Sequence, residues 1–391
     1  MKKIVSIVCL IAVLAVSAVM PAAAEEITIN VFNWGQYMAL GEDDAINVNE
    51  EFTKATGIKV NYMTYEDNES LYTKLKNGGA SYDVIFPSDY MVEKLIKANM
   101  LEKLDFNNIP NFNQISQDLK DPDYDPQNEY SVPYTAGTMG LIYNKKYVTK
   151  PVDSWSLMWD AEYKGKILMF ANPRDAFSIA QFLLGIDVNT TDSDELQKAA
   201  DKLTEQKPLV QSYVMDQIFE KMENEEAYVA AYYAGDAVTM MAENENLAFV
   251  HPKEGFNRFV DAMCVPKGCK NKAAAEAYIN FMTDAEICAA NLEYLGYTTP
   301  NVNSKEFLSE EYAQNEIIFP TDEELSHSQV FRNLPDETYE EMDSLFLKVR
   351  ASGGGNLLVF IIAAVVVAAV VVFLILRTLK KKKLYAQPEK K

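Results

Sequence analysis

Histidine is nearly absent from this sequence, and cysteine is scarce. The two histidines, His251 and His327, are isolated, and neither a G-x-S-x-G nor an H-E-x-x-H pattern occurs. Those patterns mark serine hydrolases and zinc peptidases, which need a nucleophile or a metal ligand at a fixed spacing. The four cysteines form no C-x-x-C pair and no Cys/His cluster, so the sequence predicts no metal site and no cofactor. We therefore expect a protein that is not an enzyme.

The cysteines leave the question of a disulfide open. Beyond Cys9, which lies in an N-terminal apolar run, the chain contains Cys264, Cys269 and Cys288. An odd number leaves at least one of these thiols unpaired within the chain. Cys264 and Cys269 flank the turn 266–268 and could pair, whereas free, buried thiols fit the pattern equally well.

Residues 1–24 have the pattern of a secretory signal peptide. Two lysines precede the apolar run 4–20, and three alanines at 22–24 fit a cleavage site before Glu25. Cys9 sits inside the apolar run rather than at a cleavage point, which argues against a lipid-modified N-terminus. We expect the folded part to lie outside the cytoplasm, in a periplasm or on the outer face of the cell membrane.

A second uncharged apolar run, Leu357 to Leu376, has about the length that spans a bilayer as a helix. A buried core helix would be shorter and would have a polar face. The glycine-rich linker 351–356 precedes the run, and the basic tail 377–391 follows it, which favours a cytoplasmic tail. We expect one C-terminal transmembrane helix, the N-terminus outside, and a tail too short for a folded cytoplasmic domain.

The chain carries a large excess of negative charge. The full chain has 57 acidic and 36 basic residues. Glu389 and nine of the basic residues lie in the two terminal segments. The part between the signal peptide and the second apolar run therefore has 56 acidic and 27 basic residues, a net charge of about −29. Such a surface repels nucleic acid and favours small cations. Solubility alone would also account for an acidic surface.

Length and element order predict an α/β protein of two lobes. About 330 residues exceed the usual size of a single core, and apolar strands alternate with amphipathic helices, which indicates a largely parallel sheet. Gly353, Gly354 and Gly355 form a short hinge before the apolar run, and no internal repeat occurs. We expect lobe 1 to comprise 25–138 and 262–305, and lobe 2 to comprise 139–261 and 306–350.

The periodicity predicts individual elements within both lobes. The expected strands are 27–31, 58–65, 82–86, 139–143, 166–170, 228–232 and 259–265, and the expected helices are 49–55, 70–76, a helix from Ser88 to Met100, 176–184, 194–205, 215–223, 273–282 and 285–292.

Two large aromatic residues follow the first strand. The run Asn33-Trp34-Gly35-Gln36-Tyr37 contains turn-forming residues, and loops of soluble proteins normally carry small polar side chains there. In open α/β sheets, ligands bind beyond the carboxyl ends of the strands. Trp34 and Tyr37 are therefore candidates for ligand binding, although an aromatic pair can also cover the edge of a core.

Similar residues accompany four further strands. They are Ser88, Asp89 and Tyr90; Asn172 and Asp175; Tyr233 and Asp236 after Gly235; and Phe259 with Asp261 at a second crossing between the lobes. Each acid has a structural alternative, because Ser88, Asp89 and Asp236 could cap a helix and Asp175 could offset a helix dipole. Their repeated position at strand ends favours a common site.

Aromatic and acidic side chains without lysine or arginine suit an organic cation. Aromatic faces attract ammonium groups by about 0.5 to 2 kcal/mol each. Buried carboxylates cost several kcal/mol per ion without a counter-charge. A cleft lined with them would stay open and hydrated until a diamine entered it.

Several segments resemble one family. FNWGQY, FTKATGIKVNYMTYEDNESLYTKLK, YDVIFPSDYMVEKL, DSWSLMWDAEYKGK and LGYTTPN together are similar to the polyamine-binding (spermidine/putrescine) receptor proteins of ABC importers, and the similarity covers roughly residues 27–350. The resemblance implies a two-lobed periplasmic-binding-protein type II fold with two hinge crossovers and a ligand in the cleft.

The resemblance also implies roles for individual residues. The aromatic box looks like Trp34, Tyr37, Tyr90, Tyr233 and Phe259, with Ser88 as a hydrogen-bonding neighbour, and the amine-binding acids look like Asp175, Asp236 and Asp261.

Departures from the family pattern concern ligand choice. Gln36 is neutral where spermidine-binding members tend to carry an acid, and Asn172 stands where they often have aspartate. Tyr233 and Phe259 replace what are often tryptophans, while Asp236 is similar to putrescine-binding members. The resemblance therefore favours putrescine, or mixed putrescine and spermidine binding. Gln329 is the candidate for a glutamine that some members carry in the last segment.

The leading hypothesis is a membrane-tethered receptor that delivers a polyamine to an ABC permease and its ATPase. The alternatives are another organic amine or an amino-acid derivative, whose carboxylate Arg174 could bind; a hydrolase using Asp175 and Asp261 as general acid and base; and an adhesin.

Overall fold

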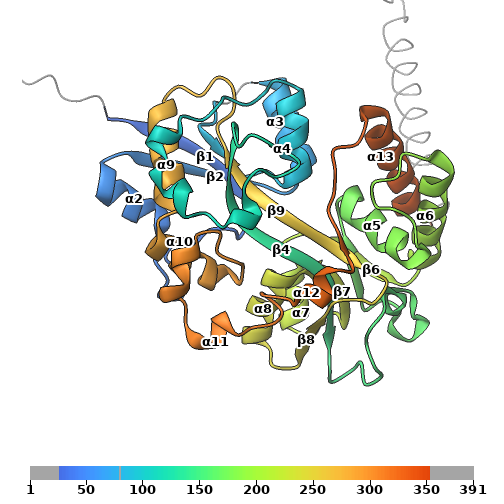
Figure 1. The fold of residues 1–391 in the computed structure, drawn as a ribbon. Coiled ribbons are helices and arrows are strands. Elements are labelled where there is room, and N and C mark those ends of the chain that lie inside the picture. The colour runs from blue at the N-terminus through green and yellow to red at the C-terminus, as the bar shows by residue number, and fades with distance from the viewer. Residues whose placement is uncertain (1–25, 79–80, 353–391) are drawn as a thin grey trace, which may run out of the picture.

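The computed structural model describes residues 26–78 and 81–352, arranged as in Figure 1. Within these residues ten strands form one sheet. Eight of them follow the order β2-β1-β3-β9-β4-β7-β5-β6, while β10 pairs with β9 and β8 pairs with β4. Two strands in the middle of the path, β4 (Ser131–Asn144) and β9 (Phe256–Cys264), cross the centre of the molecule and connect a lobe on either side.

Lobe 1 is built on parallel strands at one end of the path. β1 (Thr28–Trp34) pairs in parallel with β2 (Lys59–Tyr65) and β3 (Val84–Ile85). Val31 and Phe32 are buried in two different apolar clusters, so both faces of β1 are covered. The helices of lobe 1 are α2 (Val48–Thr56), α3 (Asn68–Asn77), α4 (Asp89–Lys97), α9 (Lys272–Met282) and α10 (Ala285–Leu295).

Lobe 2 occupies the other end. β5 (Ile167–Phe170) pairs in parallel with β6 (Val210–Val214) and β7 (Val229–Tyr233). All four residues of β5 are buried, as expected for a strand covered on both faces. The remaining elements are β8 (Leu247–Val250), α5 (Pro173–Leu184), α6 (Ser193–Gln206), α7 (Ile218–Glu223), α8 (Ala234–Glu243) and α13 (Asp336–Ala351).

The crossing strand β4 changes partner half-way along its length. Its first half pairs with β9, from Ser131 opposite Cys264 to Thr138 opposite Arg258. Its second half pairs with β7 and β8, starting with Met139 opposite Tyr233. One continuous strand therefore belongs to both lobes, and its central residues lie where the lobes meet. The division of the chain at 138/139, 261/262 and 305/306 stays a prediction.

Short elements make the remaining connections. They are η1 (Phe106–Asn108), η2 (Pro110–Gln114), η3 (Gln117–Leu119), η4 (Trp155–Trp159), η5 (Ala161–Tyr163), η6 (Val302–Glu306), α11 (Glu310–Ala313), α12 (Asp322–Leu325) and β10 (Ser328–Gln329). The run from η6 to β10 leads from lobe 1 to α13, which packs against α5 and α6 of lobe 2.

Most predicted helices are confirmed, and their ends have ordinary caps. The Asn47 side chain accepts a hydrogen bond from the backbone N–H of Glu50 at the start of α2, and Gly57 ends that helix with a φ of 77°. Asp67 forms a capping box at the start of α3. The helix predicted for 215–223 begins only at Ile218, because residues 215–217 form a turn after β6.

The prediction of a largely parallel sheet is wrong in the centre. β4 pairs antiparallel with β9, β7 and β8, and β3 pairs antiparallel with β9. β4 takes the chain from lobe 1 to lobe 2 and β9 returns it, so the two crossing strands run in opposite directions. Strand-helix alternation within each lobe carries no information about this return.

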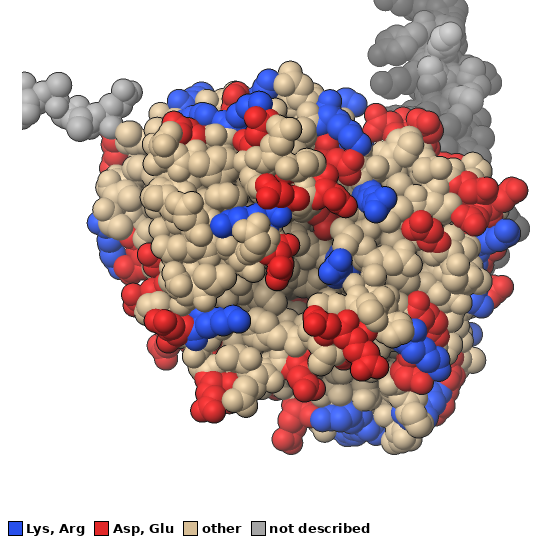
Figure 2. Space-filling model, viewed as in Figure 1, with Lys and Arg blue, Asp and Glu red and all other residues tan. Residues whose placement is uncertain are grey.

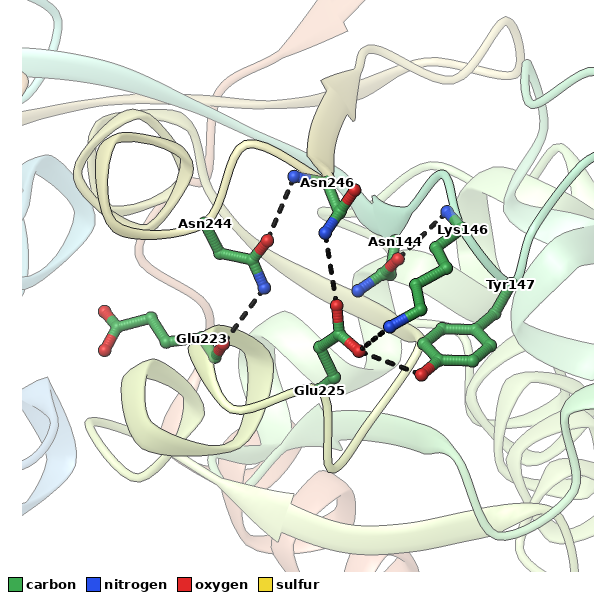
Figure 3. A network of polar contacts seen from close by, with 7 residues as sticks. All are labelled: Asn144, Lys146, Tyr147, Glu223, Glu225, Asn244 and Asn246. Atoms are coloured by element: carbon green, nitrogen blue, oxygen red, sulfur yellow. Dashed lines mark hydrogen bonds and ion pairs between the residues drawn. The ribbon is translucent and has the colours of Figure 1, made fainter.

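A network of hydrogen bonds in lobe 2 connects the residues that follow β4 with the turns before β7 and β8 (Figure 3). The Glu225 carboxylate accepts hydrogen bonds from Lys146 Nζ at 2.7 Å, Tyr147 Oη at 2.8 Å and Asn246 Nδ2 at 3.2 Å. The bond from Lys146 lowers the pKa of Glu225. Because Glu225 has a φ of 59°, a conformation unfavourable for this residue type, the three donors help to hold the turn before β7.

Two predictions concern the terminal segments and the cysteines. The signal peptide at 1–24 and the apolar run at 357–376 lie outside the described residues. Within 26–78 and 81–352, no helix is long and apolar enough to cross a membrane. Cys264, Cys269 and Cys288 are free, and Cys269 donates a hydrogen bond to Asp83 at 3.1 Å, so the Cys264–Cys269 pairing is not formed.

Candidate functional site

A cavity lies where the two lobes meet beside the crossing strands. Its empty volume is about 750 Å³, counting the part open to solvent. Most of the residues that line it come from β9 and from the ends of β1, β2, β3, β5, β6 and β7 or the segments that follow them; Tyr297 follows α10 and Phe331 follows β10. These loops stand at the carboxyl ends of parallel strands, where α/β proteins bind their ligands.

The first wall of the cavity is the aromatic turn after β1. The Asn33 side chain donates to the Tyr37 carbonyl at 3.0 Å and accepts from the Trp34 N–H at 2.8 Å, which fixes the turn. Trp34 Nε1 donates to the Phe86 carbonyl at 2.8 Å. Gln36 lies at the tip of the turn, exposed and with a φ of 46°. Trp34 and Tyr37 are thus held in place before any ligand arrives.

Asp261 lies on β9, at the centre of the crossing. Tyr37 Oη donates to its Oδ2 at 2.7 Å. The other oxygen, Oδ1, is buried and has no hydrogen-bond partner among the described residues. Because a buried carboxylate oxygen without a donor is unfavourable, this oxygen is available to a donor that enters the cavity.

Asp175 lies at the start of α5 in lobe 2. Its Oδ2 accepts hydrogen bonds from Tyr233 Oη at 2.6 Å and from Asn172 Nδ2 at 2.7 Å. The Asn172 Oδ1 accepts from the Asp175 N–H at 2.9 Å, so Asn172 caps the helix. Tyr233 also packs edge to face against Phe259, with the ring centroids 5.5 Å apart. Asp175 lies in the first turn of α5, where it also offsets the helix dipole as the structural alternative expects, and it lines the cavity as well.

Two further carboxylates accept hydrogen bonds from tyrosines. Tyr297 Oη donates to Asp236 Oδ1 at 3.0 Å, and Tyr90 Oη donates to Glu69 Oε1 at 3.0 Å. Together with Asp261 and Asp175, these make four carboxylate–tyrosine pairs around one cavity. Each tyrosine orients a carboxylate and places an aromatic ring beside it, an arrangement suited to ammonium groups.

Burial raises the pKa values of these carboxyl groups. It raises the pKa of Asp236 to about 8, of Glu69 to about 7 and of Asp261 to about 6. Burial also raises the pKa of Asp175, against the hydrogen bonds from Tyr233 and Asn172, which lower it. Neighbouring acids raise these pKa values further, whereas the Arg174 guanidinium lowers the pKa of Asp175.

Among the residues that the structure describes, eight acidic residues and no lysine or arginine line the cavity. Arg174, the candidate partner for a ligand carboxylate, is buried behind the wall and does not line the cavity. Its guanidinium donates to Asn189 Oδ1 at 2.9 Å and stacks on Phe331 at 4.5 Å. An amino-acid derivative would therefore meet no cationic partner for its carboxylate among the lining residues.

Comparison with known proteins identifies the family. Residues 47–321 match the family model described as bacterial extracellular solute-binding protein. The chain belongs to this family of solute-binding proteins.

Individual relatives of this solute-binding protein have names that include their ligands. The spermidine/putrescine-binding periplasmic protein of Escherichia coli is 34% identical over 304 residues, covering 77% of this chain and 86% of its own. The putrescine-binding periplasmic protein SpuD of Pseudomonas aeruginosa is 31% identical, covering 85% and 94%. The predicted resemblance to polyamine-binding receptors is confirmed, and the chain is a solute-binding protein rather than a hydrolase.

A solved structure agrees with the fold. The spermidine/putrescine ABC transporter substrate-binding protein PotD of Streptococcus pneumoniae is 33% identical with a TM-score of 0.70, covering 83% of this chain and 99% of its own. The α/β periplasmic-binding-protein fold predicted from the sequence is therefore confirmed.

Twelve of the predicted binding residues line the cavity of this solute-binding protein. They are Trp34, Gln36, Tyr37, Ser88, Asp89, Tyr90, Asn172, Asp175, Tyr233, Asp236, Phe259 and Asp261. Asp89 is a special case, because its two oxygens accept hydrogen bonds from the Tyr90 N–H at 2.7 Å and the Val260 N–H at 3.2 Å. It thereby ties the start of α4 to the crossing strand β9.

Gln329 is not brought to this cavity. It lines a second, larger hollow together with Arg258 and Arg332, and its Oε1 accepts from the Val188 N–H at 3.4 Å. Figure 2 shows a hollow near the middle of the face where β4 and β9 cross. Phe331, two residues further on, lines the ligand cavity instead. Because β10 has only two residues, strand alternation could not place this segment.

Several lining residues were missed from the sequence. They are Glu66, Asp67, Asn68, Glu69, Met215, Asp216, Tyr232, Asn257, Tyr297, Phe219 and Phe331, with Gly35 of the aromatic turn. Tyr297 belongs to the segment LGYTTPN, which had been noted for its resemblance but not assigned a role. The run Glu66 to Glu69 after β2 carried the same signal as the chosen sites, acidic residues directly after a strand.

Proposed function

We propose that the chain is an extracytoplasmic receptor that binds a polyamine, putrescine or spermidine or both, in the cavity between its lobes and delivers it to the permease and ATPase of an ABC importer. The cavity carries this proposal, because carboxylates and aromatic rings line it and, within 26–78 and 81–352, no lysine or arginine does. The polyamine-binding names of the relatives give independent support.

The mechanism follows from the charges. Without a ligand, closure would bury the acids of the two lobes together with no counter-charge, so they would either repel one another or take up protons, and both costs disfavour closure. A diammonium ligand supplies the missing positive charge and donates N–H groups to Asp261, Asp175 and Asp236. Because it contacts both lobes at once, it favours the closed state over the open state, and the permease receives the closed form.

Calorimetry on the full-length chain in a mild detergent tests the function. We expect putrescine or spermidine to bind at micromolar concentration or tighter, and 1,4-butanediol, which has the length of putrescine but no charge, not to bind measurably. Glutamate serves as a second control because it adds carboxylates to an acidic cavity. Absence of binding by putrescine, spermidine and spermine would reject the proposal.

We also propose that the run 357–376 anchors this receptor in the membrane. The run follows α13 by only a few residues, and six residues extend at most about 20 Å. The receptor would then stay beside the bilayer at a raised effective concentration for its permease.

Truncation tests the anchor. A chain that ends at Ser352 keeps every residue that lines the cavity, so its polyamine affinity should equal that of the full chain while the protein appears in the soluble fraction after export. Fractionation with the membranes in the absence of residues 353–391 would contradict anchoring by this run.

A further inference from the structure

The open end of the cavity carries two acids from opposite lobes. Glu66 follows β2 in lobe 1 and is exposed, whereas Asp216 follows β6 in lobe 2 and is half-buried. The acids deeper in the cavity, Asp261 and Asp175, are 4% and 8% exposed. Exposure therefore increases from the crossing strands toward Glu66 and Asp216, which marks these two as the outer end.

Asp216 reaches across to the aromatic turn of lobe 1. A Cβ atom placed on Gly35 would overlap with Asp216 Oδ2, so only the absence of a side chain at 35 lets the carboxylate lie there. The next residue, Gln36, is neutral. The aromatic turn carries no acid itself, so the negative charge beside it comes from Asp216 of lobe 2.

The charge at this end is uncompensated. Burial raises the pKa of Asp216, and the nearby Glu66 raises it further. Among the described residues, no lysine or arginine forms an ion pair with either acid, and no side chain donates a hydrogen bond to them. Asp216 in turn raises the pKa of Asp236, so the outer acids continue the row of carboxylates inside the cavity.

Unpaired atoms in the same cavity point to a ligand independently of this acidic pair. Asp261 Oδ1 and Asn257 Oδ1 are both buried, line the cavity and have no hydrogen-bond partner among the described residues. Both atoms are hydrogen-bond acceptors, so a ligand in the deep part of the cavity would need N–H donors. Asp216 and Glu66 provide a further place for a cation at the outer end.

We propose that Asp216 and Glu66 form an outer ammonium subsite that selects polyamines with a third amino group over diamines. The inference rests on the proposed polyamine binding and names the ligand within that class. Two deep ammonium groups use Asp261, Asp175 and Asp236, and a third lies between Asp216 and Glu66, where it bridges the lobes. Gln36 is neutral, which favours the shorter polyamine. The Asp216 carboxylate from lobe 2 supplies the negative charge that Gln36 does not provide.

Asp216→Asn tests the subsite. We expect spermidine to lose about tenfold in affinity and putrescine to lose less than about threefold, because one charge-assisted contact is removed at a solvent-accessible position. Glu66→Gln should act in the same direction and more weakly. Glu220→Gln is the matched control, since Glu220 is an exposed acid on the neighbouring helix α7 and should leave both affinities unchanged.

The results separate the two proposals. If wild-type protein binds no polyamine, the proposed function fails and takes the subsite with it. If it binds both amines but Asp216→Asn weakens them equally, or weakens neither, the function stands and the subsite is rejected.

A double-mutant cycle provides a second measurement. Gly35→Ala should weaken spermidine binding, because its methyl group displaces the Asp216 carboxylate. In an Asp216→Ala background the same change should have little further effect, since the displaced group is already gone. Additive losses would mean that position 35 acts without Asp216 and would overturn the contact on which the subsite depends.

Discussion

Replacing Asp261 by asparagine should lower the polyamine affinity by about 100-fold or more, because it removes the charge at the centre of the cavity. Among the described residues, the second carboxylate oxygen of Asp261 is buried and has no hydrogen-bond partner. Tyr37, which contacts its first oxygen, can still donate to an asparagine carbonyl at the same place. The change therefore removes charge while keeping the shape of the site.

The same substitution should not destabilise the empty protein. Burial raises the pKa of Asp261 to about 6, so the folded state holds a proton on this group more tightly than the unfolded state does. Stability contributed by such a group falls as the pH rises from about 4 to about 6 and stays low above that. Asparagine has no charge to bury, so above pH 6 the variant should be more stable than the parent by at most about 3 kcal/mol.

The two readouts together make the prediction specific. Thermal melts at pH 8 with and without spermidine should give an equal or higher Tm for empty Asp261→Asn, and little or no increase on adding ligand. Asp194→Asn, an exposed aspartate at the start of α6, controls for loss of charge alone. A variant that unfolds at lower temperature, or that still binds like the parent, would contradict the role given to Asp261.

Asp261 could be predicted from the sequence as a site residue, whereas Asp216 could not. Acids and aromatics after strands marked most of the cavity, because the carboxyl ends of parallel strands converge at one edge. Asp261 was found although it lies within β9, since its segment was expected at the crossing. Asp216 was missed because the residues after β6 were expected to start a helix, which places a side chain differently from the turn that exists.

The hydrogen bonds between tyrosines and carboxylates could not be predicted from the sequence either. The four carboxylate–tyrosine pairs join residues far apart in the chain, such as Tyr37 with Asp261 and Tyr90 with Glu69. Local patterns predict elements and their ends, whereas the contacts of a site between lobes depend on how the crossing strands position one lobe on the other. Gln329 came from the resemblance to the family rather than from a local pattern, and the structure brings Phe331 of the same segment to the cavity instead.

Polyamine affinity should depend strongly on pH, increasing from pH 6 to pH 8. Burial raises the pKa of Asp236 to about 8 and of Glu69 to about 7, so both groups are largely protonated in the empty cavity at pH 6. The ammonium groups of the ligand stay protonated below about pH 9, and they favour ionised carboxylates. Binding must therefore expel protons, and each expelled proton makes affinity increase by about tenfold per pH unit below the pKa of its group.

Calorimetry measures both parts of this prediction. The dissociation constant should fall as the pH rises from 6 to 8 and level off above the pKa values of the empty cavity. In buffers of different ionisation enthalpy, the measured heat should reveal net proton release at pH 7. Asp236→Asn should bind more weakly at pH 8 and should lose part of the pH dependence, since its proton no longer has to leave.

The pH profile also distinguishes a closed cation cavity from a merely acidic surface. Exposed carboxylates titrate near pH 4, so binding to the surface of this acidic chain would be nearly constant between pH 6 and pH 8 and would weaken with salt. Carboxylates that burial keeps protonated give the opposite result, a steep profile in the neutral range with weaker salt dependence. A flat profile with no proton release would mean that the ligand does not occupy the cavity containing Asp236 and Glu69.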